Sequence, residues 1–517
     1  MKQNNFSAVY TTATFVTVLS IAERSLGFLY RIVLSRLIGG EGVGLYQIAF
    51  SVYMLLHTLG AGGIPVSVSK LIAKGKADHS QTTASALSSG LFLSLCITLP
   101  CCLIMFAFPK SFAFLFSNKR SQEIFFILLP ALVFSCLYAI IRASFWGDKQ
   151  FFLPAILEVL EECILVICGI LFMQQVTTPL DGAKKASLAV AFSSFLIFII
   201  TVICYLVKKG KFCNPKKCLK PLLNASLPIT FTRTSSTFVN SILSLLLPVI
   251  LVHFGYTDSE AVTLLGTATG MVMPVLMIPA TLIASLSVVL MPQLAEDYYS
   301  KNVKKLYTSI QKGLIFAFLL PCFLIPFFFA LGEDLGRLAF SSALAGELIL
   351  KGCPILLPMC VCILTSSILN TLGFEKQTLS FYFIGTAMMF LSIIFLTPHL
   401  GIYAYILGLG LSFFTTALCN LLFLNKRCEG VFKGQKSNVK RFFIGFSLIL
   451  PLSIFGQVCL YLLKNVFGAF LSLCLAGFLL GIACVTVWTV FKILPFDFFK
   501  ALLKKFKIKK RIKILNN

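Results

Sequence analysis

The sequence predicts an all-α integral membrane protein with about fourteen transmembrane helices. Of its 517 residues, 58% are hydrophobic and only 12% are charged, whereas a soluble domain carries about 25% charged residues. Apolar stretches also follow one another along nearly the whole chain. Most of them hold about 20 residues or more, which is enough for a helix to cross the ~30 Å hydrocarbon core of a bilayer.

The positions of the lysines and arginines predict the orientation, because cytoplasmic loops of membrane proteins carry an excess of these residues. With a cytoplasmic N-terminus, 32 of the 44 cations fall on the inner side and eight on the outer side. We therefore expect a multi-pass protein of the bacterial cell membrane with both termini in the cytoplasm. The net charge of +25 then indicates contact with anionic membrane lipids, not with nucleic acid.

The expected helices form three groups. Residues 1–210 hold an N-terminal lobe of six helices, residues 211–430 hold a C-terminal lobe of six, and residues 431–495 hold two more. Residues 496–517 have the pattern of a basic amphipathic helix on the cytoplasmic surface of the membrane. The first two expected spans are Val9–Leu37 and Val43–Leu71, and no signal-peptide cleavage pattern follows the first, so we expect it to be retained.

Two pairs of segments indicate an internal repeat. The segment from Thr58 to Ala73 shares its small residues, proline and closing Leu-x-Ala with the segment from Thr281 to Ala295. Gly147-Asp-Lys-Gln similarly resembles Gly373-Phe-Glu-Lys-Gln. Each pair is separated by roughly 220–230 residues, one six-helix unit, so the second copy would enter the membrane in the same direction as the first. A parallel repeat of this kind predicts two lobes that move around a central cavity.

The first expected span carries charges where apolar residues are usual. A charge near mid-depth costs about 2.5–3.5 kcal/mol even on the lenient insertion scale. The polar residues of this span recur at steps of three or four and so share one helix face: Thr17, Ser20, Arg24, Gly27 and Arg31. Two interpretations are open. Arg24 and Arg31 could bind an anion in a cavity, or Glu23 and an arginine could form an internal clamp while Arg31 snorkels outward.

The seventh expected span, the first helix of the second copy, carries a similar stripe: Thr230, Arg233, Thr237, Asn240 and Ser244. Hydroxyl groups alone usually pack between membrane helices. The embedded arginine favours a cavity. Two lobes that each contribute a cationic, hydroxyl-bearing helix would suit an anionic, hydroxyl-rich ligand.

The fifth expected span, Phe152–Met173, contains three glutamates, of which Glu158 and Glu162 share a face. Together with Glu23 they are candidates for binding a coupling cation or a proton. The favoured alternative for Glu158 is a salt bridge at the cytoplasmic end of the span, with Arg142 or Lys149.

Other chemistries leave no signature in the sequence. Phosphate-binding Gly-rich loops and hydrolase, kinase and metalloprotease motifs are missing from it, so we expect no enzyme activity and no cofactor. Cys213 and Cys218 are the one cysteine pair that resembles a metal-ligand set, but no histidine or second pair accompanies them. We therefore expect no metal site.

Three stretches resemble the stage V sporulation protein B family: Arg24-Ser-Leu-Gly-Phe-Leu-Tyr-Arg, Gly42-Val-Gly-Leu-Tyr-Gln and Gly63-Ile-Pro-Val-Ser-Val-Ser-Lys. Leu227-Pro-Ile-Thr-Phe-Thr-Arg and Gly266-Thr-Ala-Thr-Gly-Met-Val-Met-Pro are similar to the start of its second half. The family belongs to the multidrug, oligosaccharidyl-lipid and polysaccharide exporter superfamily. The resemblance implies a fourteen-helix flippase for lipid-linked precursors of the cell wall or of polysaccharides, here spore cortex peptidoglycan.

The related lipid II flippases carry an Arg-x-x-Gly-Phe-x-Arg-Asp pattern in their first helix. Arg24, Gly27 and Phe28 match it, but the second arginine comes one position late, at Arg31, and no aspartate follows. Three hypotheses result. The first is a flippase for an undecaprenyl-pyrophosphate-linked saccharide, the second a cation-coupled multidrug exporter of the same fold, and the third a non-transporting scaffold for cell-wall synthases. Embedded arginines favour the first.

Overall fold

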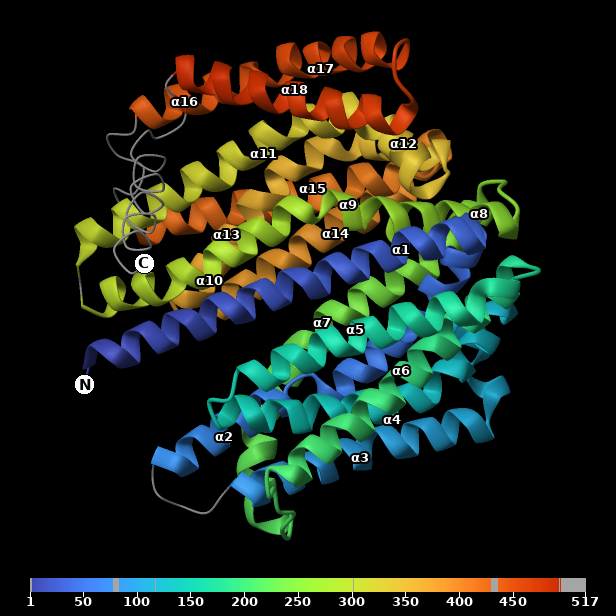
Figure 1. Ribbon diagram of the computed structural model, residues 1–517, viewed down its shortest axis with the longest axis vertical. Helices are drawn as coiled ribbons and strands as arrows, with labels where there is room; N and C mark the ends of the chain where they lie inside the picture. The colour runs from blue at the N-terminus through green and yellow to red at the C-terminus, as the bar shows by residue number, and fades with distance from the viewer. Residues whose placement is uncertain are drawn as a thin grey trace, which may run out of the picture. The chain divides into compact units, whose positions relative to one another are not determined.

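A computed structural model describes residues 2–77, 83–116, 118–300, 302–428, 436–491 and 493. All elements in these ranges are helices (Figure 1), and the chain divides into two compact units. Unit 1 consists of Met1–Pro274 and Thr397–Ile402, and unit 2 of Val275–Leu396 and Tyr403–Asn517. The expected amphipathic tail at 496–517 lies outside the described residues.

Unit 1 contains α1 (Lys2–Ala61), α2 (Ile64–Ala77), α3 (Thr83–Ala107), η1 (Pro109–Leu115), α4 (Lys119–Gly147), α5 (Phe152–Phe172), η2 (Met173–Gln175), α6 (Pro179–Val207), α7 (Lys216–His253), α8 (Asp258–Leu265) and the π-helix η3 (Gly266–Val272). The short α9 (Met273–Leu276) spans the boundary between the units.

Unit 2 contains α10 (Ile278–Tyr299), α11 (Val303–Phe340), α12 (Ala343–Gly352), η4 (Cys353–Ile355), α13 (Leu356–Thr371), most of α14 (Glu375–Leu400), α15 (Tyr403–Arg427), α16 (Lys436–Ser447), α17 (Ile449–Lys464) and α18 (Ala469–Val490).

Thirteen helical segments of the described chain are long and apolar enough to cross a membrane. The prediction of an all-α, multi-pass membrane protein is therefore confirmed. One of the 13 segments, Val18–Gly75, contains most of the first expected span and all of the second. Another expected span, α5, falls outside the set because its 21 residues include three glutamates. The expected single span Val262–Leu294 forms two segments, since the chain breaks at Met277, just before Pro279, and proline removes a helical hydrogen bond.

The turn between the first two spans depends on a glycine. Gly39 has φ +68° and ψ −178° in the middle of α1, a left-handed conformation that a side chain disfavours. The chain turns back there, so that α1 contributes two crossings (Figure 1). The residues after the turn lie against α8 and η3, backbone to backbone. A Cβ built on Gly44 would lie 2.0 Å from the Val262 carbonyl oxygen, and one on Gly266 would lie 2.2 Å from that of Gly40.

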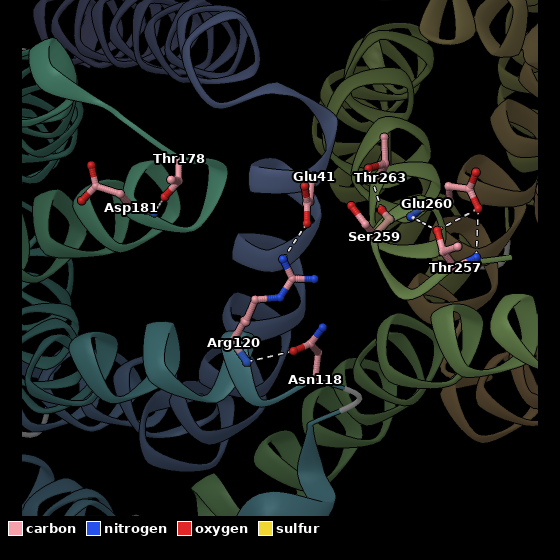
Figure 2. Close-up of polar contacts among 9 residues, drawn as sticks. All are labelled: Glu41, Asn118, Arg120, Thr178, Asp181, Thr257, Ser259, Glu260 and Thr263. Atoms are coloured by element: carbon pink, nitrogen blue, oxygen red, sulfur yellow. Dashed lines mark hydrogen bonds and ion pairs between the residues drawn. The ribbon is translucent and has the colours of Figure 1, made fainter.

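Polar side chains fix the helix ends near this turn (Figure 2). Arg120, at the start of α4, pairs with Glu41 at 2.6 Å. Thr257 and Glu260 form a capping box at the N-terminus of α8, in which each side chain binds a backbone N–H of the other residue. Thr178 caps α6 by accepting a hydrogen bond from the N–H of Asp181. These caps satisfy N–H groups that a helix cannot pair internally.

The apolar core of unit 1 gathers α2 to α7. It includes Ile64 and Ile72 of α2, Leu87 of α3, Ile140 and Phe145 of α4, Leu157 of α5, Ile197 of α6 and Leu222 of α7, all at most 3% exposed. This core holds the connections α4–α5 and α6–α7 near α2. In unit 2, separate apolar clusters join α10, α11, α13 and α15, and join α11 with α17 and α18.

The compact units do not coincide with the expected lobes. Helices α7 and α8 fall in the range 211–430 but belong to unit 1, because α7 packs along α1, α2 and α3. The two-lobe organisation with a boundary near residue 210 stays a prediction.

Candidate functional site

Unit 1 contains an open cavity of about 800 Å³ between α1, α2, α4 and α5. The ends of α4 and α5 and the first half of α1 supply most of its polar lining. The polar and aromatic residues that line it are Ser20, Glu23 and Arg24 on α1, Ser69 on α2, Trp146 and Lys149 at the end of α4, and Phe151 and Glu158 at the start of α5. Three of the sequence-predicted site residues, Glu23, Arg24 and Glu158, therefore meet in one cavity.

Helical periodicity brings the α1 residues to this cavity. Val16, Ser20, Glu23 and Arg24 all line it, at the steps of three and four that place side chains on one helix face. Arg24 is exposed. Within the described residues its side chain takes part in no hydrogen bond or ion pair, so the guanidinium at the cavity wall keeps its donors available for a ligand.

Glu158 is neutralised from behind the cavity. Its Oε1 lies 2.9 Å from Nη1 of Arg142 on α4, which confirms the salt bridge favoured from the sequence. The Arg142 guanidinium also lies 5.0 Å from the ring centre of Tyr138 and 5.2 Å from that of Trp146. Because aromatic faces attract cations, these two rings hold Arg142 in place beside the carboxylate.

Glu162, the other glutamate of the predicted pair on α5, lies beside Gly27 of α1. Gly27 leaves space for Glu162, whose Oε1 would lie 3.3 Å from a Cβ built there. Glu162 Oε2 is buried and has no hydrogen-bond partner among the described residues. The exposed side chain of Arg31 acts on Glu162 electrostatically. Neither Arg31 nor Glu162 lines the cavity that Arg24 faces.

The predicted stripe on α7 packs against the second half of α1. Thr230 Oγ1 accepts a 3.0 Å hydrogen bond from the N–H of Gly63, and Thr237 Oγ1 lies 3.2 Å from Thr58 Oγ1. Arg233 Nη1 donates a 2.8 Å hydrogen bond to the carbonyl of Gly62. In this structure these residues therefore hold α7 against α1 and the start of α2. This is the packing role that hydroxyl groups usually have between membrane helices.

Asn240, the last predicted residue on α7, is exposed, and its carbonyl accepts a hydrogen bond from Ser244. Neither Asn240 nor Arg233 is among the residues that line the cavity with Arg24.

The sequence did not single out four residues of the cavity as ligands: Ser69, Trp146, Lys149 and Phe151. Lys149 entered only as a loop cation and a partner for Glu158. A signal for it was present, because the segment Gly147–Gln150 is one of the two that indicated a repeat. Among the described residues, no cluster of three or more His, Cys, Asp or Glu side chains is arranged to hold a metal ion. Cys218 instead lies 3.3 Å from Ser85.

A family model for polysaccharide biosynthesis proteins matches residues 10–298, which cover most of α1, all of α2 to α9 and most of α10. The chain belongs to the polysaccharide biosynthesis protein family. The matched region contains the whole cavity and the α7 stripe.

Two relatives are similar to the chain at low identity. Stage V sporulation protein B of Bacillus subtilis (strain 168) is 26% identical over 348 residues, 62% of this chain and 65% of that protein. Lipid II flippase MurJ of the same organism is 22% identical over 330 residues, 58% of this chain and 60% of that protein. The chain thus spans less than two thirds of the length of these two relatives.

Solved structures show the fold class of this polysaccharide biosynthesis protein. A lipid II flippase MurJ in an inward closed conformation has a TM-score of 0.65 at 18% identity and covers 93% of this chain and 99% of that one. An inward-facing multidrug resistance MATE family transporter of the MOP superfamily has a TM-score of 0.67 at 17% identity, over 80% and 96% of the two chains. The fold is that of MOP-superfamily transporters, and the names of these proteins describe transport rather than catalysis.

Proposed function

We propose that this protein is a flippase that moves a lipid-linked saccharide precursor across the bacterial cytoplasmic membrane by alternating access. The substrate would be an undecaprenyl-pyrophosphate-linked saccharide or peptidoglycan precursor, used for spore cortex, cell-wall or polysaccharide synthesis. Both termini would lie in the cytoplasm. The relatives include a sporulation protein and a lipid II flippase, which supports this substrate class.

The observation that carries the proposal is the state of Arg24. It lies at the wall of a cavity of about 800 Å³ with no ion pair inside the described part of the chain. The neighbouring Glu158 is already neutralised by Arg142. A guanidinium presents paired N–H donors that fit phosphate oxygens, and a cation at a cavity wall without a partner attracts an anion. A diphosphate headgroup meets that requirement.

Arg31 and the α7 residues Thr230, Arg233, Thr237 and Asn240 enter as contacts for later steps. In the present structure α7 is bound to α1 through Arg233 and Gly62. Alternating access requires helices of this kind to separate, and separation would free the guanidinium of Arg233 and the hydroxyl groups for the substrate. Glu23, Glu158 and Glu162 are the proposed sites for a coupling ion or proton.

Reconstitution tests the proposal. Purified protein in proteoliposomes should move fluorescently labelled undecaprenyl-diphosphate saccharide between leaflets, and Arg24→Ala should abolish the movement. Arg24→Lys should retain part of it, because an ammonium binds phosphate as a point charge. The matched control is Arg337→Ala, which removes an exposed arginine near the end of α11. Full transport by Arg24→Ala would refute the role of Arg24.

A second candidate function is a cation-coupled multidrug exporter. The cavity lining favours it in one respect, since it combines the carboxylate of Glu23 with the aromatic rings of Trp146 and Phe151. An organic cation would bind such a surface through cation–π and ionic contacts. Efflux of ethidium from vesicles, lost in Glu23→Gln but not in Arg24→Ala, would support the exporter over the flippase.

A further inference from the structure

The turn between α4 and α5 holds a lysine in a backbone conformation that normally belongs to glycine. Lys149 has φ +61°, in the left-handed region, which costs an L-residue about 1–2 kcal/mol. The hydrogen bonds identify the turn. The N–H of Lys149 donates to the carbonyl of Trp146, and the N–H of Gln150 to that of Phe145, the pattern of a Schellman cap, in which the left-handed position is usually glycine.

The second half of the chain contains the same cap with glycine in place. At the end of α13, the N–H of Gly373 donates to Asn370 and the N–H of Phe374 to Leu369, with φ +85° at Gly373. The hydrogen bonds therefore make Lys149 the equivalent of Gly373. The sequence resemblance had paired Gly373 with Gly147, two positions earlier. Both halves of the chain thus have this cap, and at its left-handed position the first half has a lysine where the second has a glycine.

The side chain at this strained position lies at the cavity. Lys149 and Arg24 both line it, and Lys149 is exposed and forms no ion pair with another described residue. The N-terminus of α5 begins at the same wall with Phe151, which provides no side-chain cap. The first N–H groups of a helix have no partner within it and attract anions. The cations Lys149 and Arg24 therefore favour an anion at this wall, next to the start of α5.

The charges around the cavity agree with this reading. Glu23 and Glu158 also line it, but Arg142 neutralises Glu158 at 2.9 Å. Lys149 and Arg24 then face Glu23 alone, so the wall carries a net positive charge. The aromatic rings of Trp146 and Phe151 line the same cavity, where they offer apolar surface to the part of a ligand next to its charged group.

We propose that Lys149 is a phosphate contact of this cavity, which binds the diphosphate group of the lipid-linked substrate together with Arg24 and the N-terminus of α5. The inference rests on the proposed function, since it assigns a second ligand within the same site. The left-handed turn holds the Lys149 side chain at the cavity wall. Lys209 adopts the same conformation away from the cavity, so the position of Lys149 at the wall, and not the strain, carries the proposal.

Fluorescence of Trp146 provides a direct test, because the chain has only two tryptophans. The other, Trp488, is 2% exposed in α18 and packs edge-on against Phe323. In a Trp488→Phe background, titration with undecaprenyl diphosphate in detergent should change the emission of Trp146.

Lys149→Gly should weaken this binding about tenfold or more, since a charge-assisted hydrogen bond is lost, while the melting temperature stays equal or rises as the strain is relieved. Lys149→Arg, which keeps the charge, should bind within a few-fold of the parent.

Lys209 supplies the matched control. It occupies the same left-handed cap position at the end of α6, with φ +57° and the corresponding bonds to Leu206 and from Gly210 to Tyr205. It is exposed but does not line the cavity. Lys209→Gly should relieve the same strain and remove the same charge near a helix C-terminus, without any change in binding.

The probe also separates two sources of phosphate. A response to inorganic pyrophosphate as strong as that to the lipid would mean that a free diphosphate suffices, and a response to undecaprenyl diphosphate alone would mean that the lipid is needed. Either supports the proposal if Lys149→Gly removes it. Unchanged binding in Lys149→Gly, with binding lost in Arg24→Ala, would overturn the role of Lys149 and leave the proposed function standing. Absence of any lipid movement by the parent protein in proteoliposomes would instead refute the proposed function.

Discussion

Arg233 of α7 donates a 2.8 Å hydrogen bond to the carbonyl of Gly62, immediately beyond the C-terminus of α1. The carbonyls at a helix C-terminus carry partial negative charge and lack partners within the helix, so a cation there is stabilising. The bond thus connects the first helix of the expected second lobe to the break between α1 and α2, inside the second expected span. It gives Arg233 a structural role in this conformation and makes its release a step of the proposed transport cycle.

Substitution of Arg233 should separate these two roles. Arg233→Ala should lower the free energy of unfolding by about 1–2 kcal/mol, because the helix end loses its cation and a carbonyl loses its partner. Arg233→Lys should recover most of that stability. Thermal unfolding in detergent measures the first effect, and lipid movement in proteoliposomes measures the second. Normal stability together with abolished transport would show that substrate contact is the dominant role.

The salt bridge between Arg142 and Glu158 predicts a strongly asymmetric effect. Arg142→Met should destabilise the protein by about 3–5 kcal/mol, because it leaves the largely buried carboxylate of Glu158 without its partner. The double variant Arg142→Met with Glu158→Leu should recover much of that loss, since it leaves no unpaired charge. A double-mutant cycle on detergent thermostability measures the coupling. Equal stability of the single and double variants would contradict the pairing.

The contact between the Gly39 turn and α8 predicts sensitivity to the smallest substitution. Gly44→Ala should disrupt the approach of α1 to α8, because its Cβ would lie 2.0 Å from the Val262 carbonyl oxygen, far inside van der Waals contact. Crosslinking between cysteines introduced at Glu41 and Thr263 should fall in this variant. Gly468→Ala is the control, as a Cβ there meets nothing within 4 Å. Unchanged crosslinking in Gly44→Ala would show that the helices shift to accept a methyl group.

The predicted orientation can be measured at the two ends of α7. Lys216 begins this helix and Asp258 begins α8 just after it ends, and α7 is about 57 Å long at 1.5 Å per residue, enough to cross the bilayer. In a background without native cysteines, an impermeant thiol reagent added outside intact cells should label Asp258→Cys and leave Lys216→Cys unlabelled. Labelling of position 216 under these conditions would reverse the topology.

Much of the fold could be predicted from the sequence because membrane helices are specified locally. Length and apolarity decide whether a segment can span, so the all-α class and nearly every span were accessible from composition and spacing. The number of spanning segments differed from the expected fourteen at three places, where length and apolarity alone did not decide the outcome. Gly39 turned two spans within one continuous helix, the glutamates of α5 lowered its apolarity, and Pro279 divided an expected span.

The candidate site was predictable only in part. The face shared by Ser20 and Arg24 follows from helical periodicity, and both residues line the cavity. Lys149 and Trp146 come from a different helix end, and no periodicity links them to α1. The strain at Lys149 was also invisible, because a left-handed backbone angle cannot be read from a lysine in a sequence.

The sequence by itself determined the class of the protein, its spans, the polar faces of α1 and α7, and the resemblance to its family. These properties depend on neighbours within one or two helical turns. Only the tertiary structure decided which polar groups are already satisfied. Arg142 neutralises Glu158 and Arg233 binds the end of α1, whereas Arg24 and Lys149 face a cavity without partners among the described residues. The physical reason is that pairing between charges depends on which helix faces meet, and packing between distant segments sets that.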